Sequence, residues 1–216
     1  MSNQTILFDF DGTLANTIPG ILATLEATKQ QMKVDFSLSL AQSLIGKPLV
    51  NMAPSLVGEE RVGEFVNTYL EQFPAIGGEM VEFFPGVEPL IKALQTKGII
   101  VGIVTSKRRD SLLQNLQKLK AEALFDFIVT NEDTEFHKPH PAPVEKALDL
   151  AGAEPKDAVM VGDSPYDILA GNGAGCTTIA VTWGADSEET VKAAHPDHLV
   201  NKIDELESLL FRIMKS

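Results

Sequence analysis

Two aspartates separated by one residue, Asp9 and Asp11, stand where an apolar run ends in a glycine turn, in the segment Phe8-Asp9-Phe10-Asp11-Gly12. Carboxylates this close repel each other unless a cation or a shared proton compensates them. Such a pair can supply a nucleophile and an acid–base group, or it can be an ordinary solvated turn. An EF-hand calcium loop does not fit, because the later oxygen ligands and the final bidentate glutamate are missing. The segment alone leaves catalysis and a plain turn open.

A second pair of aspartates, Asp163 and Asp167, also follows an apolar run, in Gly162-Asp163-Ser164-Pro165-Tyr166-Asp167. Proline suits the first turn of a helix, so a helix is predicted to begin here. Two carboxylates four residues apart across that turn can face one pocket. Together with Asp9 and Asp11 they would form the hard oxygen site that Mg²⁺ prefers. Both aspartates could instead only cap the helix.

Two further segments supply groups that a phosphate needs. Thr105 and Ser106 follow an apolar run and offer hydroxyl and backbone N–H donors, although either could be an ordinary helix N-cap. Lys138 stands in the loop His137-Lys138-Pro139, where a lysine can act as a point charge toward phosphate. A lysine in a loop can equally be solvated, so neither segment decides the matter by itself.

The polar residues follow short apolar runs with the length and composition of buried parallel strands. Five strands are predicted: Thr5–Phe10, Ile99–Val104, Phe127–Thr130, Ala158–Val161 and Thr177–Val181. Four stretches with apolar residues at helical spacing alternate with these runs or follow the last of them: Val87, Leu90, Ile91 and Leu94; Leu112, Leu113, Leu116 and Leu119; Val144, Ala147, Leu148 and Ala151; Ile203, Leu206, Leu210 and Ile213. This alternation predicts an α/β fold with a doubly wound parallel sheet, whose ligands bind beyond the carboxyl ends of the strands.

Residues 15–83 interrupt the alternation. They contain no convincing strand, but two stretches, 18–32 and 62–73, carry apolar residues at helical spacing. We therefore expect an all-helical domain inserted directly after the first strand and its aspartate turn.

Composition narrows the range of partners. The net charge of -12 disfavours nucleic acid and anionic membrane as main partners. Cys176 is the only cysteine, lies among small residues, and is predicted to pack in the core of a protein from a reducing compartment. The first residues lack the pattern of a signal peptide, and the apolar runs are too short to cross a bilayer. A cytoplasmic protein is predicted.

The four segments, in this order, resemble the motifs of the haloacid dehalogenase-like phosphohydrolase superfamily, and of its helical-capped subgroup in particular. The matching positions are Asp-x-Asp-Gly-Thr at residues 9–13, Thr105 at a strand end, Lys138-Pro139, and Gly-Asp-x-x-x-Asp at residues 162–167. The resemblance implies a Rossmann-like catalytic core made of residues 1–14 and 84–216, and a helical cap made of residues 15–83.

The resemblance also implies a role for each aspartate. Asp9 would be the nucleophile that becomes an aspartyl phosphate, and Asp11 would be the general acid and base. Mg²⁺ would be held by the side chains of Asp9 and Asp163 and the backbone carbonyl of Asp11. Asp167 would lie nearby and orient a ligand or bind water.

The remaining motif residues would contact the substrate. Thr105 and Ser106 would bind the phosphoryl oxygens, and Lys138 would steady both the phosphate and the nucleophile. Lys47 lies in the segment 43–49, which is similar to the substrate-facing loop of phosphoglycolate phosphatases. It could contact the distal part of a substrate or remain solvated.

The predicted reaction is therefore the Mg²⁺-dependent hydrolysis of a small phosphorylated metabolite, such as a phosphoglycolate-like monoester, by a monomer or homodimer. Gln42, however, stands where many phosphoglycolate phosphatases carry arginine. A pyrophosphatase of the same superfamily is an alternative. A phosphomutase of the β-phosphoglucomutase type is disfavoured, because residues 15–83 contain no histidine. A catalytically silent metal-binding interaction module is also disfavoured, because every motif residue is present.

The roles inferred from the sequence predict the effect of one substitution. Asp9→Asn should abolish turnover and leave the fold intact, because the amide is a poor nucleophile of nearly the same shape. Phosphate release measures the first effect and circular dichroism the second. Near-wild-type turnover in this variant would contradict the assigned mechanism.

Overall fold

The computed structural model describes residues 3–214, and it contains a six-stranded sheet in which every pairing is parallel. The strand order is β3-β2-β1-β4-β5-β6. The strands are β1 Thr5–Phe8, β2 Ile100–Val104, β3 Phe127–Val129, β4 Ala158–Gly162, β5 Thr177–Val181 and β6 His198–Val200. The predicted doubly wound α/β fold is confirmed.

The first strand occupies the middle of the sheet, with β2 on one side and β4 on the other. Its last residue, Phe8, is in register with Ile103 and with Val161. The loops that follow these three strands therefore leave the sheet at the same edge. The first strand was predicted to reach Phe10, but it ends at Phe8, because the backbone turns there into the aspartate loop.

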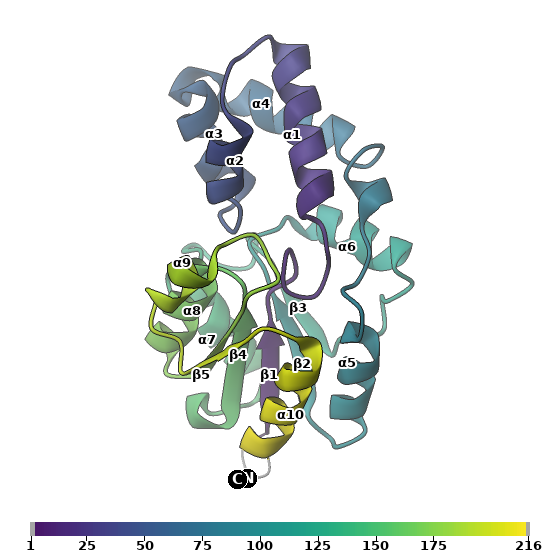
Figure 1. The fold of residues 1–216 in the computed structure, drawn as a ribbon, viewed down its shortest axis with the longest axis vertical. Helices are drawn as coiled ribbons and strands as arrows, with labels where there is room; N and C mark the ends of the chain where they lie inside the picture. Colours follow the sequence, from purple (N-terminus) through teal and green to yellow (C-terminus); the bar gives the residue numbers. More distant parts are fainter. Residues whose placement is uncertain (1–2, 215–216) are drawn as a thin grey trace.

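Helices cover both faces of the sheet (Figure 1). They are α5 Val87–Gln95, α6 Arg109–Lys118, α7 Ala142–Ala151, α8 Pro165–Ala174, α9 Glu188–Lys192 and α10 Ile203–Ile213. Side chains alternate between the faces along β1: Ile6 and Phe8 pack in one core cluster with residues of α5, α6 and α10, and Leu7 packs in another with residues of α7 and α8.

Two details differ from the sequence expectations. Leu113, placed in the apolar stripe of its helix, is 44% exposed, because Leu112 and Leu116 take the buried face of α6. Strand β6 and helix α9 were not predicted, because both are short and neither contains a long apolar run.

Cys176 is buried in the α7–α8 cluster, and burial raises the pKa of its thiol to about 11, which suits the predicted packing role.

The segment between β1 and α5 is helical and gathers above the carboxyl ends of the strands (Figure 1). It consists of α1 Ile18–Met32, α2 Leu38–Ser43, α3 Leu49–Val57 and α4 Val62–Gln72, with single 3₁₀ turns at Glu59–Arg61 and Gly78–Met80. We call it the helical insertion. It has a core of its own, in which Leu25 and Phe65 are completely buried. Treating it as a separate cap domain with bounds at 15 and 83 stays a prediction.

The helical insertion is joined to the sheet by two chain segments that lie side by side. Ala15 forms an antiparallel bridge with Phe83, and the N–H of Asn16 donates to the carbonyl oxygen of Glu82 at 2.8 Å. Among residues 3–214, no helix has both the length and the apolar character that a membrane crossing requires.

The base of the helical insertion offers a test of its packing. Gly20, on α1, lies so close to Gly77 that an added Cβ would be 2.7 Å from the Gly77 carbonyl oxygen. Gly20→Ala should therefore lower the free energy of unfolding by about 1–3 kcal/mol. Gly63→Ala is the matched control, since Gly63 is also helical and a Cβ there meets nothing within 4 Å. It should raise that free energy by about 0.5–1 kcal/mol. Urea unfolding measures both, and a Gly20→Ala protein as stable as wild type would contradict the packing argument.

Candidate active site

Three neighbouring strands deliver the chemical groups to one edge of the sheet. Asp9 follows β1, and its N–H donates to the carbonyl oxygen of Val161 at 2.9 Å, which continues the ladder one residue past the strand. Thr105 follows β2 in the same way, donating to Val129 at 2.9 Å. Asp163 follows β4. The parallel register thus brings Asp9 together with Thr105 and Asp163, which lie 96 and 154 positions further along the sequence, as the motif order led us to expect.

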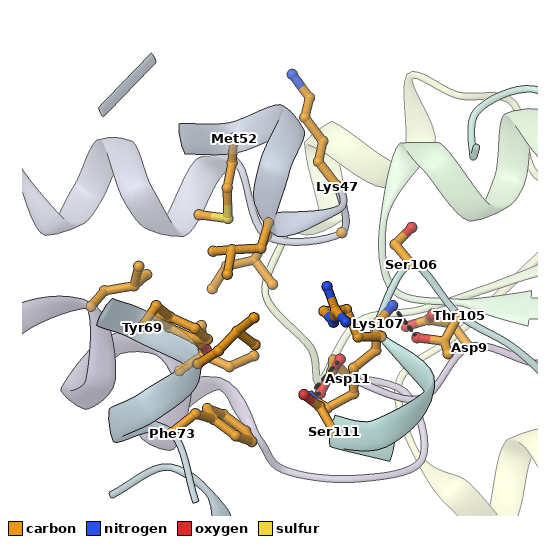
Figure 2. Close-up of a pocket in the computed structure, with 17 residues that line it drawn as sticks. Asp9, Asp11, Lys47, Met52, Tyr69, Phe73, Thr105, Ser106, Lys107 and Ser111 are labelled. Atoms are coloured by element: carbon orange, nitrogen blue, oxygen red, sulfur yellow. Dashed lines mark hydrogen bonds and ion pairs between the residues drawn. The ribbon is translucent and has the colours of Figure 1, made fainter. Parts of the chain in front are cut away.

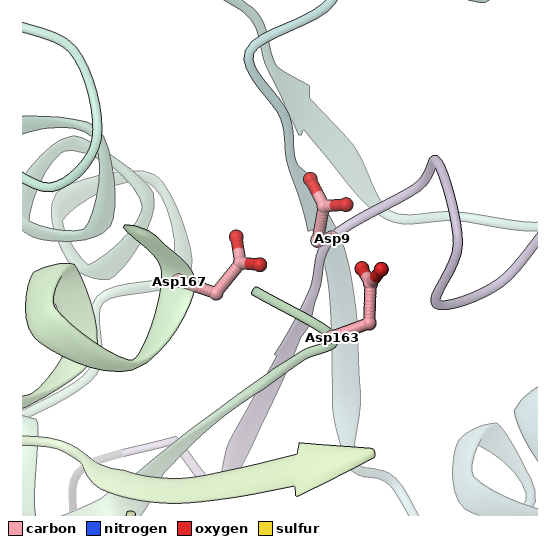
Figure 3. Close-up of side chains that lie close together, drawn as sticks. All are labelled: Asp9, Asp163 and Asp167. Atoms are coloured by element: carbon pink, nitrogen blue, oxygen red, sulfur yellow. The ribbon is translucent and has the colours of Figure 1, made fainter. Parts of the chain in front are cut away.

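The carboxylates of Asp9, Asp163 and Asp167 form a buried cluster (Figure 3). One oxygen from each lies within 4.8 Å of the others, and the three residues are between 1% and 5% exposed. Oxygen ligands of this kind suit a hard divalent cation such as Mg²⁺. The structure therefore brings together three of the four predicted metal-binding aspartates by their side chains.

Lys138 is the cation of this cluster. Its ammonium group donates to Asp9 at 2.7 Å, to Asp167 at 2.5 Å and to the carbonyl oxygen of Val104 at 3.0 Å. An ammonium group has three N–H donors, so this geometry uses all of them. The side chain is almost completely buried, which explains why a lysine in a loop is not solvated here.

The cluster holds more negative than positive charge. Burial raises the pKa of Asp9 to about 7, the nearby carboxylates of Asp167 and Asp11 add to the effect, and Lys138 opposes it. Burial, with Asp9 and Asp167, also raises the pKa of Asp163 well above its usual value. Burial would lower the pKa of Lys138, but Asp167 and Asp9 outweigh that and raise it. A bound divalent cation would relieve this imbalance, so the residues present fit a metal ion.

Asp167 has a second partner besides the lysine. Its other carboxylate oxygen accepts hydrogen bonds from the backbone N–H of Ser164 at 3.1 Å and from the Ser164 hydroxyl at 2.6 Å, within a capping box at the start of α8. The helix-capping alternative thus holds for Asp167. It does not exclude the metal role, because the oxygen that accepts from Lys138 is a different one from the capping oxygen.

Asp163 is fixed by two loops. The Thr13 hydroxyl donates to one carboxylate oxygen at 2.9 Å, and the N–H of Ala185 donates to the other at 2.7 Å. Both loops approach through glycine: an added Cβ at Gly12 or Gly184 would lie 2.4 or 2.1 Å from Asp163. The loop after β5 was missed from the sequence, where nothing marks Gly184 and Ala185.

Asp11 lies apart from the cluster and is paired with another cation. The Lys107 ammonium contacts its carboxylate oxygens at 2.9 and 3.2 Å (Figure 2). The sequence analysis assigned no role to Lys107. The predicted metal contact of Asp11 through its backbone carbonyl stays a prediction.

The two hydroxyl groups after β2 both remain able to donate. Thr105 Oγ1 accepts a hydrogen bond from the Lys107 N–H at 3.1 Å, which leaves the hydroxyl proton of Thr105 for another partner. Ser106 Oγ is buried and has no hydrogen-bond partner within residues 3–214. A buried hydroxyl without a partner is costly, so an anion that accepts from both hydroxyls would satisfy the site.

A pocket opens between these loops and the helical insertion (Figure 2). Asp9, Asp11 and Lys107 lie on its sheet side, and the space open to the centres of water molecules is about 80 Å³. The opposite wall is mostly apolar and was not identified from the sequence: Ile21, Leu25, Leu49, Met52, Tyr69, Leu70 and Phe73.

Lys47 lines the same pocket but extends away from Asp11 (Figure 2). Its ammonium group lies 5.5 Å from the ring centroid of Tyr166. The structure thus places Lys47 at the margin of the pocket, and its predicted contact with substrate stays a prediction.

The burial of Lys138 predicts a large effect on stability. Lys138→Met leaves Asp9 and Asp167 buried without their cation, and removing one partner of a buried ion pair costs about 3–5 kcal/mol. Lys92→Met is the control, because Lys92 forms an exposed ion pair with Glu88 and should cost less than about 1 kcal/mol. Urea unfolding compares the two variants, and equal losses would contradict the assignment of Lys138 as the internal cation.

Comparison with known proteins agrees with this geometry. The family model described as haloacid dehalogenase-like hydrolase matches residues 6–181. The pyrophosphatase PpaX of Bacillus cereus is 35% identical over 217 residues, which cover 100% of both chains.

Solved structures show the same fold. A predicted phosphatase from Clostridium acetobutylicum superposes with a TM-score of 0.87 at 26% identity, covering 98% of this chain and 99% of the other. A predicted phosphoglycolate phosphatase from Haemophilus somnus superposes with a TM-score of 0.83 at 24% identity, covering 97% and 98%. The match of the family model and the full-length similarity confirm the resemblance drawn from the sequence motifs: the chain belongs to the haloacid dehalogenase-like hydrolase family.

Proposed function

We propose that the chain hydrolyses a small phosphorylated compound in two steps, with Asp9 as the nucleophile and Mg²⁺ as the cofactor. The observation that carries this proposal is the buried cluster of Asp9, Asp163 and Asp167, with its single ammonium group, beside a pocket that also holds Asp11. The residues proposed as nucleophile, acid–base group and phosphate-binding groups thus all lie at one edge of the sheet.

In the first step, a carboxylate oxygen of Asp9 attacks phosphorus, and the bond from phosphorus to the leaving oxygen breaks. The carboxylic acid form of Asp11 gives its proton to that oxygen. The hydroxyls of Thr105 and Ser106 hold the transferring phosphoryl oxygens, and the ammonium group of Lys138, which contacts Asp9, acts as a nearby point charge that offsets their negative charge. This step leaves an aspartyl phosphate on Asp9.

In the second step, the Asp11 carboxylate takes a proton from a water molecule whose oxygen attacks phosphorus. The bond between phosphorus and Asp9 breaks, which releases inorganic phosphate and restores the Asp9 carboxylate. Asp11 returns to its acid form, so the cycle closes without another reactant. Two carboxyl groups with different roles need different surroundings, and here Asp9 contacts Lys138 whereas Asp11 contacts Lys107.

The proposed Mg²⁺ would be held by Asp9 and Asp163, with Asp167 nearby. When bound it supplies positive charge that favours the ionised form of the carboxylates and offsets charge on the phosphoryl oxygens. Thr13 and Ala185 keep Asp163 oriented for this task, because each donates a hydrogen bond to one of its two oxygens.

The size of the pocket suits a small substrate. One bound water needs roughly 10–15 Å³ of space on the measure that gives about 80 Å³ for this pocket. Pyrophosphate and a phosphoglycolate-like monoester are of suitable size. The full-length similarity to pyrophosphatases favours pyrophosphate as the first candidate. The likeness to structures named as phosphoglycolate phosphatases at 24% identity supports the fold alone.

A substrate panel tests the proposed function. Purified protein is incubated with pyrophosphate, phosphoglycolate, β-glucose 1-phosphate and other small phosphoesters, with Mg²⁺ or with EDTA, and free phosphate is measured. We expect Mg²⁺-dependent release, fastest from pyrophosphate, and none from the Asp9→Asn variant. No phosphate from any compound, or undiminished release in EDTA, would contradict the proposal. Isomerised glucose phosphate without free phosphate would favour the mutase alternative.

A cytoplasmic location and a monomeric or homodimeric state stay predictions from the sequence.

A further inference from the structure

The Lys107 side chain stands between two parts of the molecule. Its ammonium group binds both carboxylate oxygens of Asp11 on the sheet side of the pocket. The same ammonium group lies 4.8 Å from the ring centroid of Phe73, which follows α4 in the helical insertion. One cation therefore contacts the proposed acid–base group and the aromatic wall opposite it.

The contact with Phe73 changes the surroundings of the ion pair. Phe73 is buried and stacked on Tyr69, with ring centroids 5.6 Å apart, so its position is fixed by the core of the helical insertion. The side chains of Lys107 and Asp11 are only 8% and 15% exposed. An ion pair that is shielded from water holds its geometry better than an exposed one, which contributes little.

The backbone around both residues is anchored to the sheet. The Lys107 N–H donates to Thr105 Oγ1, and its carbonyl oxygen accepts from the N–H of Asn131 at 3.3 Å. The loop that carries Asp11 is anchored by the indole N–H of Trp183, which donates to the carbonyl oxygen of Thr13 at 3.1 Å. Phe73 is thus the member of this contact that belongs to the helical insertion.

We propose that Lys107 is a positioning residue for Asp11, and that it holds the Asp11 carboxylate in place only while Phe73 of the helical insertion covers its ammonium group. The inference rests on the proposed function, since it concerns the residue assigned there as acid and base. Lys107 itself transfers no proton and forms no bond to the substrate. It makes the placement of Asp11 depend on the placement of the helical insertion.

The first test removes the cation. Lys107→Met keeps the length of the side chain, and it should lower kcat for the best substrate of the panel by about 10- to 100-fold, because a misplaced acid–base group loses much of its effect. KM should change much less than kcat. Lys29→Met is the matched control: Lys29 also lies over a phenylalanine of the helical insertion, Phe36, at 5.6 Å, and pairs with Asp35, but lies outside the pocket. Its kcat should equal that of the wild type.

The second test removes the ring. Phe73→Leu keeps an apolar side chain and should lower kcat by about three- to tenfold, because the ammonium group loses the aromatic face and becomes hydrated. Phe36→Leu is its control and should leave kcat unchanged. If Phe73 acts through Lys107, the double variant Lys107→Met/Phe73→Leu should have the same kcat as Lys107→Met alone. If the two residues act independently, the fold-reductions in kcat of the two single variants should multiply in the double variant. Crystal structures of both single variants should show the Asp11 carboxylate displaced.

The outcomes separate this inference from the proposed function. A wild-type protein that releases no phosphate from the panel overturns both. If the wild-type protein has Mg²⁺-dependent activity, three results would each overturn the inference alone. These are a kcat of Lys107→Met within about twofold of wild type, fold-reductions in kcat that multiply in the double variant, and an Asp11 carboxylate that stays in place in the variants. Thermal unfolding shows which variants are folded, and Phe73→Leu still tests the inference if Lys107→Met fails to fold.

Discussion

The arrangement at the carboxyl edge of the sheet depends on one interaction, the ammonium group of Lys138 held between the carboxylates of Asp9 and Asp167. Buried carboxylates cost free energy unless positive charge and hydrogen bonds compensate them. Lys138 supplies part of that charge and also ties the loop before α7 to the carbonyl oxygen at the end of β2. The same ammonium group therefore stabilises the folded edge and orients Asp9, the proposed nucleophile. One ammonium group does not balance the charge of three carboxylates.

The sheet provides what this interaction needs in geometry. Central placement of β1 allows its loop to meet the loops after β2 and β4, because the three strands end within one residue of the same level. Although the net charge of the chain is -12, each of the two aspartates has a cation beside it: Lys138 forms an ion pair with Asp9, and Lys107 with Asp11. Under the proposed function, an acidic protein would hold an anionic substrate through a few fixed groups. The electrostatic field of the whole chain, which carries a net negative charge, does not attract an anion.

Much of this could be predicted from the sequence, because the signals are local. Apolar runs predicted five of the six strands within one or two residues, and the aspartates and Lys138 were found because each stands at the end of a run or in a motif. The ion pair between Lys107 and Asp11 could not be predicted, since it joins residues 96 positions apart and lysine is a common surface residue. The hydrogen bond from Ala185 to Asp163 could not be predicted either, because its donor is a backbone N–H, which almost every residue type has.

The position of β1 also has a consequence for how the protein is made. This strand is synthesised before its partners, residues 100–103 and 158–161, so its apolar side chains have no sheet neighbour until those residues have also left the ribosome. Contacts of such long sequence separation form slowly. The buried core residues of the helical insertion all lie within residues 21–73, so this core has no such delay. During biosynthesis the apolar residues of β1 therefore stay exposed, and prone to aggregation, while the helical insertion can already fold.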